Sequence, residues 1–341
     1  MTSSITVHRP TRFVPHPSWG PKTTALVRAL RSAAQRSTFE MTPVQTRRLL
    51  ERIAWLAPRV SGIRRTDARV GGVPATWYLP SGHRGPDARV LMHLHGGGFA
   101  LCSQRTHGTM VSELATAAGA RGLLPRYRLA PEHPYPAALD DCEAAYVGLL
   151  ASGVHPSRII LSGDSAGGNL VVSLAVRLRE AGIPLPRALV LLSPWVDLTA
   201  SGVSVDSNAC YDYVTRPILD RFAELYAASC DPTSPELSPL RANLRGLPPT
   251  LIQVGGAESL LSEGCEFAAK ARAAGVQVSL QKWEGMVHAW QGYSFALPDA
   301  RDAIAEVGRY VHRLYGARAA IEQRPIPTLA PAFAGPTRSR R

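Results

Sequence analysis

The sequence predicts an α/β fold built around a mainly parallel, doubly wound sheet. From about residue 70 onward, short apolar runs alternate with helical stretches, and this alternation is typical of a parallel sheet with helices on both faces. Several of the runs are apolar at every position, as a strand that is covered on both faces requires. Ligands of such sheets bind at the carboxyl ends of the strands. The residues directly after each run are therefore the first candidates for a functional site.

The predicted elements follow in chain order. Two helices at the start have apolar residues at helical spacing, over 22–34 and 43–57, and Thr42-Pro43 supplies the N-cap and first turn of the second. The strands are expected over residues 70–79, 88–96, 121–127, 158–163, 187–194, 249–256 and 276–283. The helices between them are expected over residues 106–119, 138–152, 165–182 and 264–275. We therefore expect a helical cap segment over 1–70, a main domain over 71–316, and a second cap element near 201–234.

Composition describes an ordinary globular protein. The chain has 341 residues, of which 45% are hydrophobic and 19% charged. No run of about 18 apolar residues appears, and the first residues lack the apolar stretch of a secretory signal. We therefore predict a cytoplasmic protein without stable membrane insertion. The Pro- and Arg-rich end, residues 317–341, is predicted to be a disordered basic tail.

The net charge of +12 is concentrated at the two ends of the chain. Residues 1–70 hold 13 Arg and Lys against 3 Asp and Glu, and residues 317–341 hold 5 against 1, whereas residues 71–316 hold 20 against 22. No basic-aromatic motif accompanies the charge, so we expect no nucleic-acid partner. The cysteines form no CxxC pair and have no metal-ligand spacing with histidine, so we expect no metal site. They are Cys102, Cys142, Cys210, Cys230 and Cys265.

The strongest candidate for catalysis is Ser165, at the centre of the sequence Gly-Asp-Ser-Ala-Gly. This pentapeptide follows the expected strand at 158–163 and opens a helix. A serine on such a tight turn has a strained backbone, and the flanking glycines leave room for close approach. Its hydroxyl then lies at the carboxyl edge of the sheet, beside the positive end of a helix dipole. We therefore predict that Ser165 is a nucleophile.

A run of three glycines, His95-Gly96-Gly97-Gly98, ends the strand expected at 88–96. Consecutive glycines cost chain entropy, and their expected use is to aim backbone N–H groups at a developing oxyanion. Gly97 and Gly98 are expected to supply two donors, and Ala166 a third. His95 is expected to hold this loop by hydrogen bonding rather than to act as a base.

The predicted base is His288, in a loop directly after the strand at 276–283. A histidine late in the chain fits the order nucleophile, acid, base. The predicted acid is Glu258, which follows the strand at 249–256 and would orient His288 and stabilise its imidazolium. Glu263 stays the alternative, but it falls about one turn into the next helix, where the helix dipole already explains a carboxylate.

With these motifs, the chain resembles the hormone-sensitive-lipase-like branch (family IV) of bacterial α/β-hydrolases, a family of carboxylesterases. The resemblance covers roughly residues 60–316 and also rests on Tyr-Arg-Leu-Ala-Pro-Glu-His-Pro at 127–134 and Ser-Pro-Trp-Val-Asp-Leu at 193–198. It implies the α/β-hydrolase fold, with residues 71–316 as the catalytic domain and a helical cap over an apolar acyl pocket. It also implies a Ser/acid/His triad and an oxyanion hole in the glycine loop. Within the family the chain is most similar to actinobacterial acetyl-hydrolases and esterases.

Two positions depart from the family pattern. The family usually has Asp where Glu258 stands, and a carboxylate one methylene longer can do the same work. The residue before Tyr127 is usually Asp and here is Arg126, which we expect to affect the loop rather than catalysis.

The expected function is hydrolysis of short- to medium-chain carboxylic esters through an acyl-enzyme on Ser165, without metal or organic cofactor. A small-molecule ester is the expected partner, and a homodimer is left open. An amide deacetylase or lactone hydrolase would use the same triad. A non-catalytic small-molecule-binding member of the fold is disfavoured by the late histidine, and a long-chain lipase is supported only by the basic N-terminal helices. The apolar side chains of the second cap element either line the pocket or form an ordinary helix face; they are Tyr211, Tyr213, Ile218, Leu219 and Phe222.

Overall fold

The computed structural model describes residues 12–82 and 88–316. Within them, an eight-stranded sheet has the order β1-β2-β4-β3-β5-β6-β7-β8. β2 pairs antiparallel with β1 and with β4, and every other pair is parallel. This confirms the predicted mainly parallel sheet. The strands are β1 Ile63–Val70, β2 Val73–Pro80, β3 Arg89–Leu94, β4 Ala120–Pro125, β5 Ile159–Asp164, β6 Ala188–Leu192, β7 Thr250–Gly255 and β8 Val278–Trp283.

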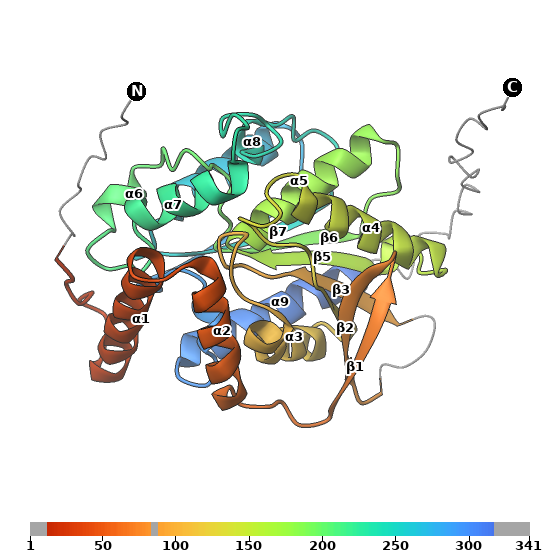
Figure 1. Cartoon of the computed structure of the whole chain (residues 1–341). Coiled ribbons are helices and arrows are strands. Elements are labelled where there is room, and N and C mark those ends of the chain that lie inside the picture. The colour runs from red at the N-terminus through yellow and green to blue at the C-terminus, as the bar shows by residue number, and fades with distance from the viewer. Residues whose placement is uncertain (1–11, 83–87, 317–341) are drawn as a thin grey trace, which may run out of the picture.

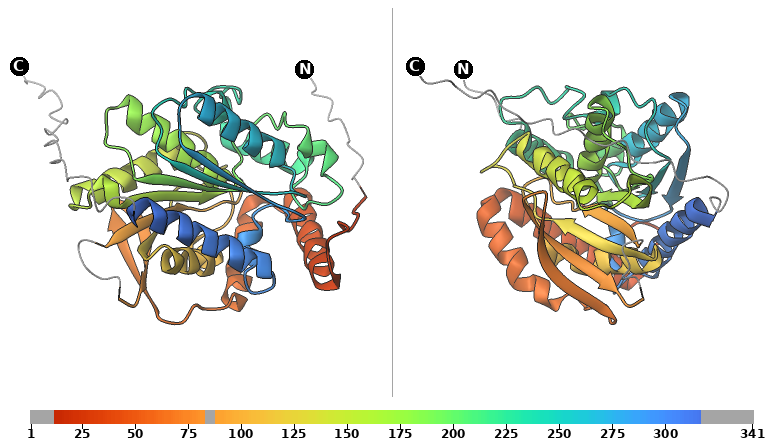
Figure 2. Two further views of the ribbon diagram at one scale, coloured as in Figure 1. Left: turned by 180° about the vertical axis from the view of Figure 1, so that it is seen from behind. Right: turned by 90° about the vertical axis from the view of Figure 1, so that its right-hand side faces the viewer.

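Helices cover both faces of the sheet (Figure 1). One face carries α3 (Gln104–Ala117) and α9 (Pro298–Gly316), and the other carries α4 (Ala137–Ala151), α5 (Ala166–Glu180) and α8 (Leu261–Ala273). The turned views of Figure 2 show the same two layers around the sheet. Short 3₁₀ turns cover Ala54–Leu56, Pro156–Arg158, Pro239–Arg241 and Trp290–Tyr293.

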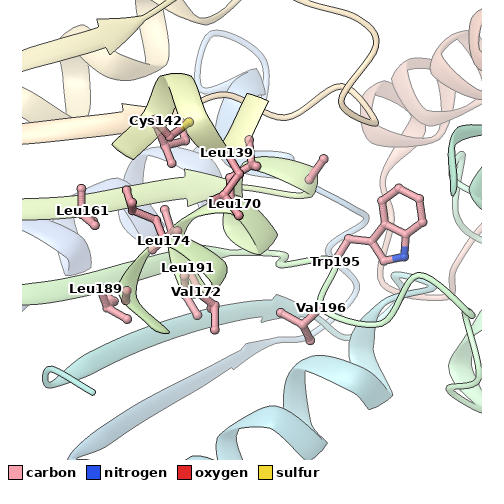
Figure 3. Packing of buried hydrophobic residues seen from close by; sticks show 14 of the residues in the cluster. Leu139, Cys142, Leu161, Leu170, Val172, Leu174, Leu189, Leu191, Trp195 and Val196 are labelled. Atoms are coloured by element: carbon pink, nitrogen blue, oxygen red, sulfur yellow. The ribbon is translucent and has the colours of Figure 1, made fainter. Parts of the chain in front are cut away.

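The core consists of apolar side chains on each side of the sheet. Leu161 and Leu191 from neighbouring strands pack with Leu170 of α5 (Figure 3), and all three are fully buried. On the opposite face, Val190 belongs to a second cluster with Val307 of α9. Because both faces are covered, the central strands need apolar residues at every position. Because the strands are packed on both faces, their carboxyl ends, where the candidate site lies, are held in place.

In the described part of the chain, four further helices lie beyond the carboxyl ends of the parallel strands (Figure 1). They are α1 Pro21–Phe39, α2 Pro43–Ile53, α6 Ser204–Ser207 and α7 Arg216–Ala227. Thr42 is the N-cap of α2, as predicted, and it forms a capping box because Thr42 and Gln45 each accept the other's backbone N–H. α1 contacts α7, so the N-terminal helices and the 201–234 segment are joined. Their function as a cap stays a prediction.

The segment predicted to be a helical cap, residues 1–70, ends instead in a strand of the sheet. β1 pairs with β2 through the turn Gly71-Gly72, where φ is +57° and +80°. The strand predicted over 70–79 therefore starts only at Val73. β1 is an edge strand whose charged residues are largely exposed, so it lacks the apolar alternation that would have predicted it. α9 is likewise absent from the prediction.

Two predictions concern segments outside the described residues. These are the lack of a secretory signal, which was judged on the first residues, and the disordered tail at 317–341. Within the described part of the chain, no helix combines the length and the apolar character needed to cross a membrane.

Candidate active site

Ser165 lies on a sharp turn between β5 and α5. Its φ of 54° and ψ of −124° are unusual for a residue with a side chain and cost roughly 1–3 kcal/mol. The turn is held because the Ser165 N–H donates to Leu192 O at 3.0 Å, and the Ser165 carbonyl accepts from Trp195 N at 3.0 Å. A Cβ on Gly167 would lie 1.9 Å from Leu94 O, so this position requires glycine. The serine is left partly exposed at the start of α5.

A second serine–histidine pair lies beneath this turn. Ser162 Oγ lies 3.1 Å from His93 Nδ1, and both residues are fully buried within neighbouring strands. A substrate cannot reach a side chain that is covered in this way. The pair therefore braces β3 against β5, and Ser165 is the serine that a substrate can approach.

The glycine loop follows β3 and lies beside the Ser165 turn. Gly97 and Gly98 have φ values of +107° and +59°, which favour glycine. A Cβ on Gly96 would lie 3.0 Å from Ser165 Cβ, so the loop and the serine are in close contact. Among the described residues, no hydrogen bond uses the N–H of Gly97 or Gly98. Their use as oxyanion-hole donors stays a prediction.

His95 packs behind the loop. Its ring stacks on Tyr127 with centroids 4.4 Å apart, and the Tyr127 hydroxyl donates to the His95 carbonyl at 2.6 Å. Nδ1 lies 2.7 Å from Gly96 O. Burial, aided by nearby His107, lowers the pKa of His95 to about 3, so the ring is neutral at physiological pH. This geometry suits the supporting role expected of His95.

Asp164 anchors the same loop. Its Oδ1 accepts the Gly96 N–H at 3.0 Å and lies 3.0 Å from His93 Nε2, and its Oδ2 lies 3.3 Å from His107 Nε2. Burial alone would raise its pKa, but the charge and hydrogen bonds of His107 and His93 hold the pKa well below its ordinary value. A buried carboxylate therefore fixes the loop immediately before its two free N–H groups.

Glu258 and His288 lie on the loops that follow β7 and β8. Glu258 Oε2 is 3.9 Å from His288 Nδ1, which is longer than a hydrogen bond, although catalytic hydrogen bonds commonly tighten when substrate binds. Among the described residues, His288 Nδ1 has no hydrogen-bond partner. Burial lowers the pKa of His288 to about 4 and raises that of Glu258 well above its usual value. The neutral imidazole is the form that a general base requires.

Ser193 bridges the acid and the base loop. Its hydroxyl donates to Glu258 Oε2 at 2.5 Å and accepts the N–H of Ala289, directly after His288, at 3.0 Å. Ser193 is fully buried and follows β6. The residues after β5, β6, β7 and β8 are thus brought together at one edge of the sheet.

The competing residues have other partners. Glu263 lies in α8, and its Oε1 accepts the Val196 N–H at 2.6 Å, so it supports the loop after β6. A second histidine follows Ser165 in the chain, His312. It lies in α9, where its Nε2 is 3.1 Å from Ala117 O, and α9 packs with α3 on one face of the sheet rather than at its carboxyl edge.

The second cap element reaches the glycine loop. A Cβ on Gly98 would lie 2.5 Å from Phe222 Cγ of α7, and the Tyr213 ring meets His288 edge-on with centroids 5.9 Å apart. Ile218 and Leu219 are buried in the core. Ile218 and Leu219 thus fit the interpretation as a packed helix face, whereas a pocket lined by Phe222 and Tyr213 stays a prediction.

Comparisons with known proteins identify the family. A family model described as alpha/beta hydrolase fold matches residues 91–292. An acetyl-hydrolase of Streptomyces hygroscopicus is 42% identical over 248 residues, which are 72% of this chain and 82% of the relative. A crystal structure of an esterase from the bacterial hormone-sensitive lipase family is 43% identical with a TM-score of 0.82, and the match covers 87% of this chain and 99% of that one. The chain belongs to this family.

This hormone-sensitive-lipase-family protein is a carboxylesterase, a serine hydrolase, as the sequence predicts. A further solved structure, of the esterase EstE5 soaked with p-nitrophenyl butyrate, is 37% identical with a TM-score of 0.82 and covers 87% of this chain and 100% of that one. Two buried residues of this esterase support the candidate site but were not singled out from the sequence: Asp164 and Ser193. Asp164 stands beside the predicted nucleophile and Ser193 directly follows a strand, and these two positions in the sequence could have pointed to them.

Proposed function

We propose that this esterase hydrolyses short- to medium-chain carboxylic esters through an acyl-enzyme on Ser165. The supporting observation is the strained, partly exposed Ser165 at the carboxyl edge of the sheet, with Glu258 and His288 on the loops after the next strands. The helix dipole of α5 favours negative charge at this point.

The chemistry follows from the residues in turn. Neutral His288 takes the proton from the Ser165 hydroxyl as its oxygen attacks the ester carbonyl. The carbonyl oxygen becomes negative and accepts hydrogen bonds from the N–H groups of Gly97, Gly98 and Ala166, each worth on the order of 3 kcal/mol in the transition state. The imidazolium is stabilised by Glu258 and gives its proton to the departing alcohol. Water then attacks the acyl-enzyme with the same assistance and releases the acid.

The preference for shorter acyl chains is supported by relatives and by the cap. The relative from Streptomyces hygroscopicus is an acetyl-hydrolase, and the similar esterase EstE5 was soaked with a butyrate ester. In this chain the Phe222 side chain packs against Gly98 of the glycine loop, and we expect it to restrict the length of the acyl chain. An amide or lactone hydrolase would use the same residues, so the test begins with esters of increasing chain length.

The test is a series of p-nitrophenyl esters from acetate to palmitate with wild type, Ser165→Ala and Ser229→Ala. Ser229 is an exposed serine after α7 and serves as the matched control. We expect an optimum at short to medium chains, loss of activity in Ser165→Ala, and unchanged activity in Ser229→Ala. After treatment of the wild-type protein with phenylmethylsulfonyl fluoride, mass spectrometry should locate the phenylmethylsulfonyl adduct on Ser165. Full activity in Ser165→Ala, or an optimum at palmitate, would overturn the proposal.

A further inference from the structure

The cap insertion holds the main chain of His288 from both sides. Asp212 Oδ1 accepts the His288 N–H at 3.2 Å, and the Tyr213 hydroxyl donates to the His288 carbonyl at 2.9 Å. Two consecutive residues of the insertion therefore satisfy both backbone polar groups of the predicted base. The ring of Tyr213 also lies edge-on to the imidazole. The orientation of His288 thus depends on a segment 76 residues earlier in the chain.

The same insertion holds the loop of the predicted acid. Asp212 Oδ2 accepts the N–H of Ser259, the residue after Glu258, at 2.8 Å. Asn208 Nδ2 donates to the Glu258 carbonyl at 2.9 Å. One carboxylate therefore binds the backbones of the acid loop and of the base loop, and it adds a second bridge between them beside Ser193.

The N-terminal helix α1 binds the main chain of Asp212, next to this carboxylate. Arg31 is 5% exposed, and its Nη1 donates to the carbonyl oxygens of Ala209 and Asp212 at 2.6 and 2.5 Å. The charged or titratable groups around Asp212 include Arg31 from α1, Glu258 and His288 from the two loops, Cys210 and Tyr213 from the insertion, and Tyr293 from the turn before α9.

Burying the carboxylate of Asp212 costs desolvation free energy. It is fully buried, and burial raises its pKa to about 6, although backbone N–H groups from Ser259, His288 and Tyr213 oppose the rise. An apolar residue would fill such a position at less cost in desolvation. What only a carboxylate supplies is two acceptor oxygens that bind two separate loops at once.

We infer that Asp212 and Tyr213 are positioning residues that hold Glu258 and His288 in register, and that Arg31 links this arrangement to the N-terminal cap. The inference rests on the triad assigned in the proposed function. The 3.9 Å between Glu258 Oε2 and His288 Nδ1 must shorten by about 1 Å for a hydrogen bond. A misplacement of that size in a catalytic group can change a rate about 100-fold, so a clamp on both loops has a direct effect on turnover.

The test compares Asp212→Asn and Tyr213→Phe with two matched controls. The controls are Asp206→Asn, an exposed aspartate of the same insertion, and Tyr135→Phe, whose hydroxyl donates to surface Glu236. We expect kcat on p-nitrophenyl butyrate to fall about 10- to 100-fold in Asp212→Asn and about 3- to 10-fold in Tyr213→Phe, with KM within about twofold. Inactivation of Ser165 by phenylmethylsulfonyl fluoride should slow in parallel, because it also requires an oriented His288. The controls should match wild type.

A role in stability alone would lower the melting temperature and leave kcat and the inactivation rate unchanged at 20 °C. A folded Asp212→Asn with kcat within threefold of wild type would therefore overturn the inference. If Asp212→Asn does not fold, Tyr213→Phe decides it, because that change removes only one hydroxyl, and wild-type kinetics there would overturn it. Ser165→Ala separates the two proposals. An inactive Ser165→Ala beside a fully active Asp212→Asn refutes the clamp alone, whereas an active Ser165→Ala refutes the site assignment itself.

Arg31→Gln, with exposed Arg36→Gln on the same helix as control, tests the link to the cap. If both residues act on the same segment, Arg31→Gln should lower kcat, and the double variant Arg31→Gln/Asp212→Asn should have no lower kcat than Asp212→Asn alone. Unchanged kcat in Arg31→Gln, or fully additive losses, would refute the link.

Discussion

The substitution Glu258→Gln distinguishes the two carboxylates that the sequence offers as the catalytic acid. Glu258 and Glu263 are the same residue type, both are at most 1% exposed, and burial raises the pKa of each well above its usual value. They differ in what they face. Glu258 Oε2 lies 3.9 Å from His288 Nδ1, whereas Glu263 Oε1 accepts the Val196 N–H at 2.6 Å. Glu263→Gln is therefore a matched control.

The expected size of the effect follows from the distance. When His288 takes the serine proton, unit charges 3.9 Å apart attract by about 4 kcal/mol at an effective dielectric constant of about 20. Each 1.36 kcal/mol changes the rate tenfold, so Glu258→Gln should lower kcat roughly 1,000-fold with little change in KM. Glu263→Gln weakens one buried hydrogen bond and should lower the free energy of unfolding by about 1–3 kcal/mol, with kcat within about tenfold of wild type.

The assay is kcat and KM on p-nitrophenyl butyrate for the three proteins, together with urea unfolding of each. The pH profile gives a second measure. The ionised form of Glu258 stabilises the imidazolium, and its raised pKa means that ionisation is completed only at higher pH. Wild-type kcat should therefore rise with pH, and Glu258→Gln should lose that rise. The reasoning is refuted if Glu258→Gln keeps kcat within tenfold of wild type, or if folded Glu263→Gln loses as much.

Three further predictions concern the glycine loop and its supports. Asp164→Asn removes the charge that holds the Gly96 N–H, so kcat should fall about 10- to 100-fold at nearly constant KM; steady-state kinetics with wild-type values would contradict this. Gly98→Ala places a Cβ 2.5 Å from Phe222 Cγ at a φ of +59° and should lower kcat at least about tenfold. Gly98→Ala/Phe222→Ala should recover part of that loss, and no recovery would argue against the clash. The pKa of His95 is about 3 in the folded protein and about 6.5 in the unfolded chain, so between these values only the unfolded chain binds the proton, and the residue's contribution to stability falls as pH drops. The decrease in unfolding free energy from pH 7 to pH 5 should therefore be about 2 kcal/mol larger in wild type than in His95→Gln, and equal decreases measured by urea unfolding would refute the assignment.

Local sequence determined the sheet and the outline of the site. Apolar runs that alternate with helical stretches predicted the doubly wound sheet because strands covered on both faces leave no position for polar residues. Ser165 could be recognised because a strained strand-to-helix turn requires glycines at fixed offsets, and the clash that a Cβ on Gly167 would make with Leu94 O shows why. The edge strand β1 was missed because its exposed charged residues carry no such pattern.

The tertiary structure decided which residues hold the site together. Asp164 meets His93, 71 residues away, and Asp212 meets His288, 76 residues away. It also showed that Glu258 faces His288 whereas Glu263 faces the Val196 N–H, although the two carboxylates are only five positions apart in the sequence. Periodicity reports which face of an element a residue lies on, but not which distant segment packs against that face. Those pairings depend on how the cap and the loops meet beyond the strand ends, where no repeating backbone pattern fixes the geometry.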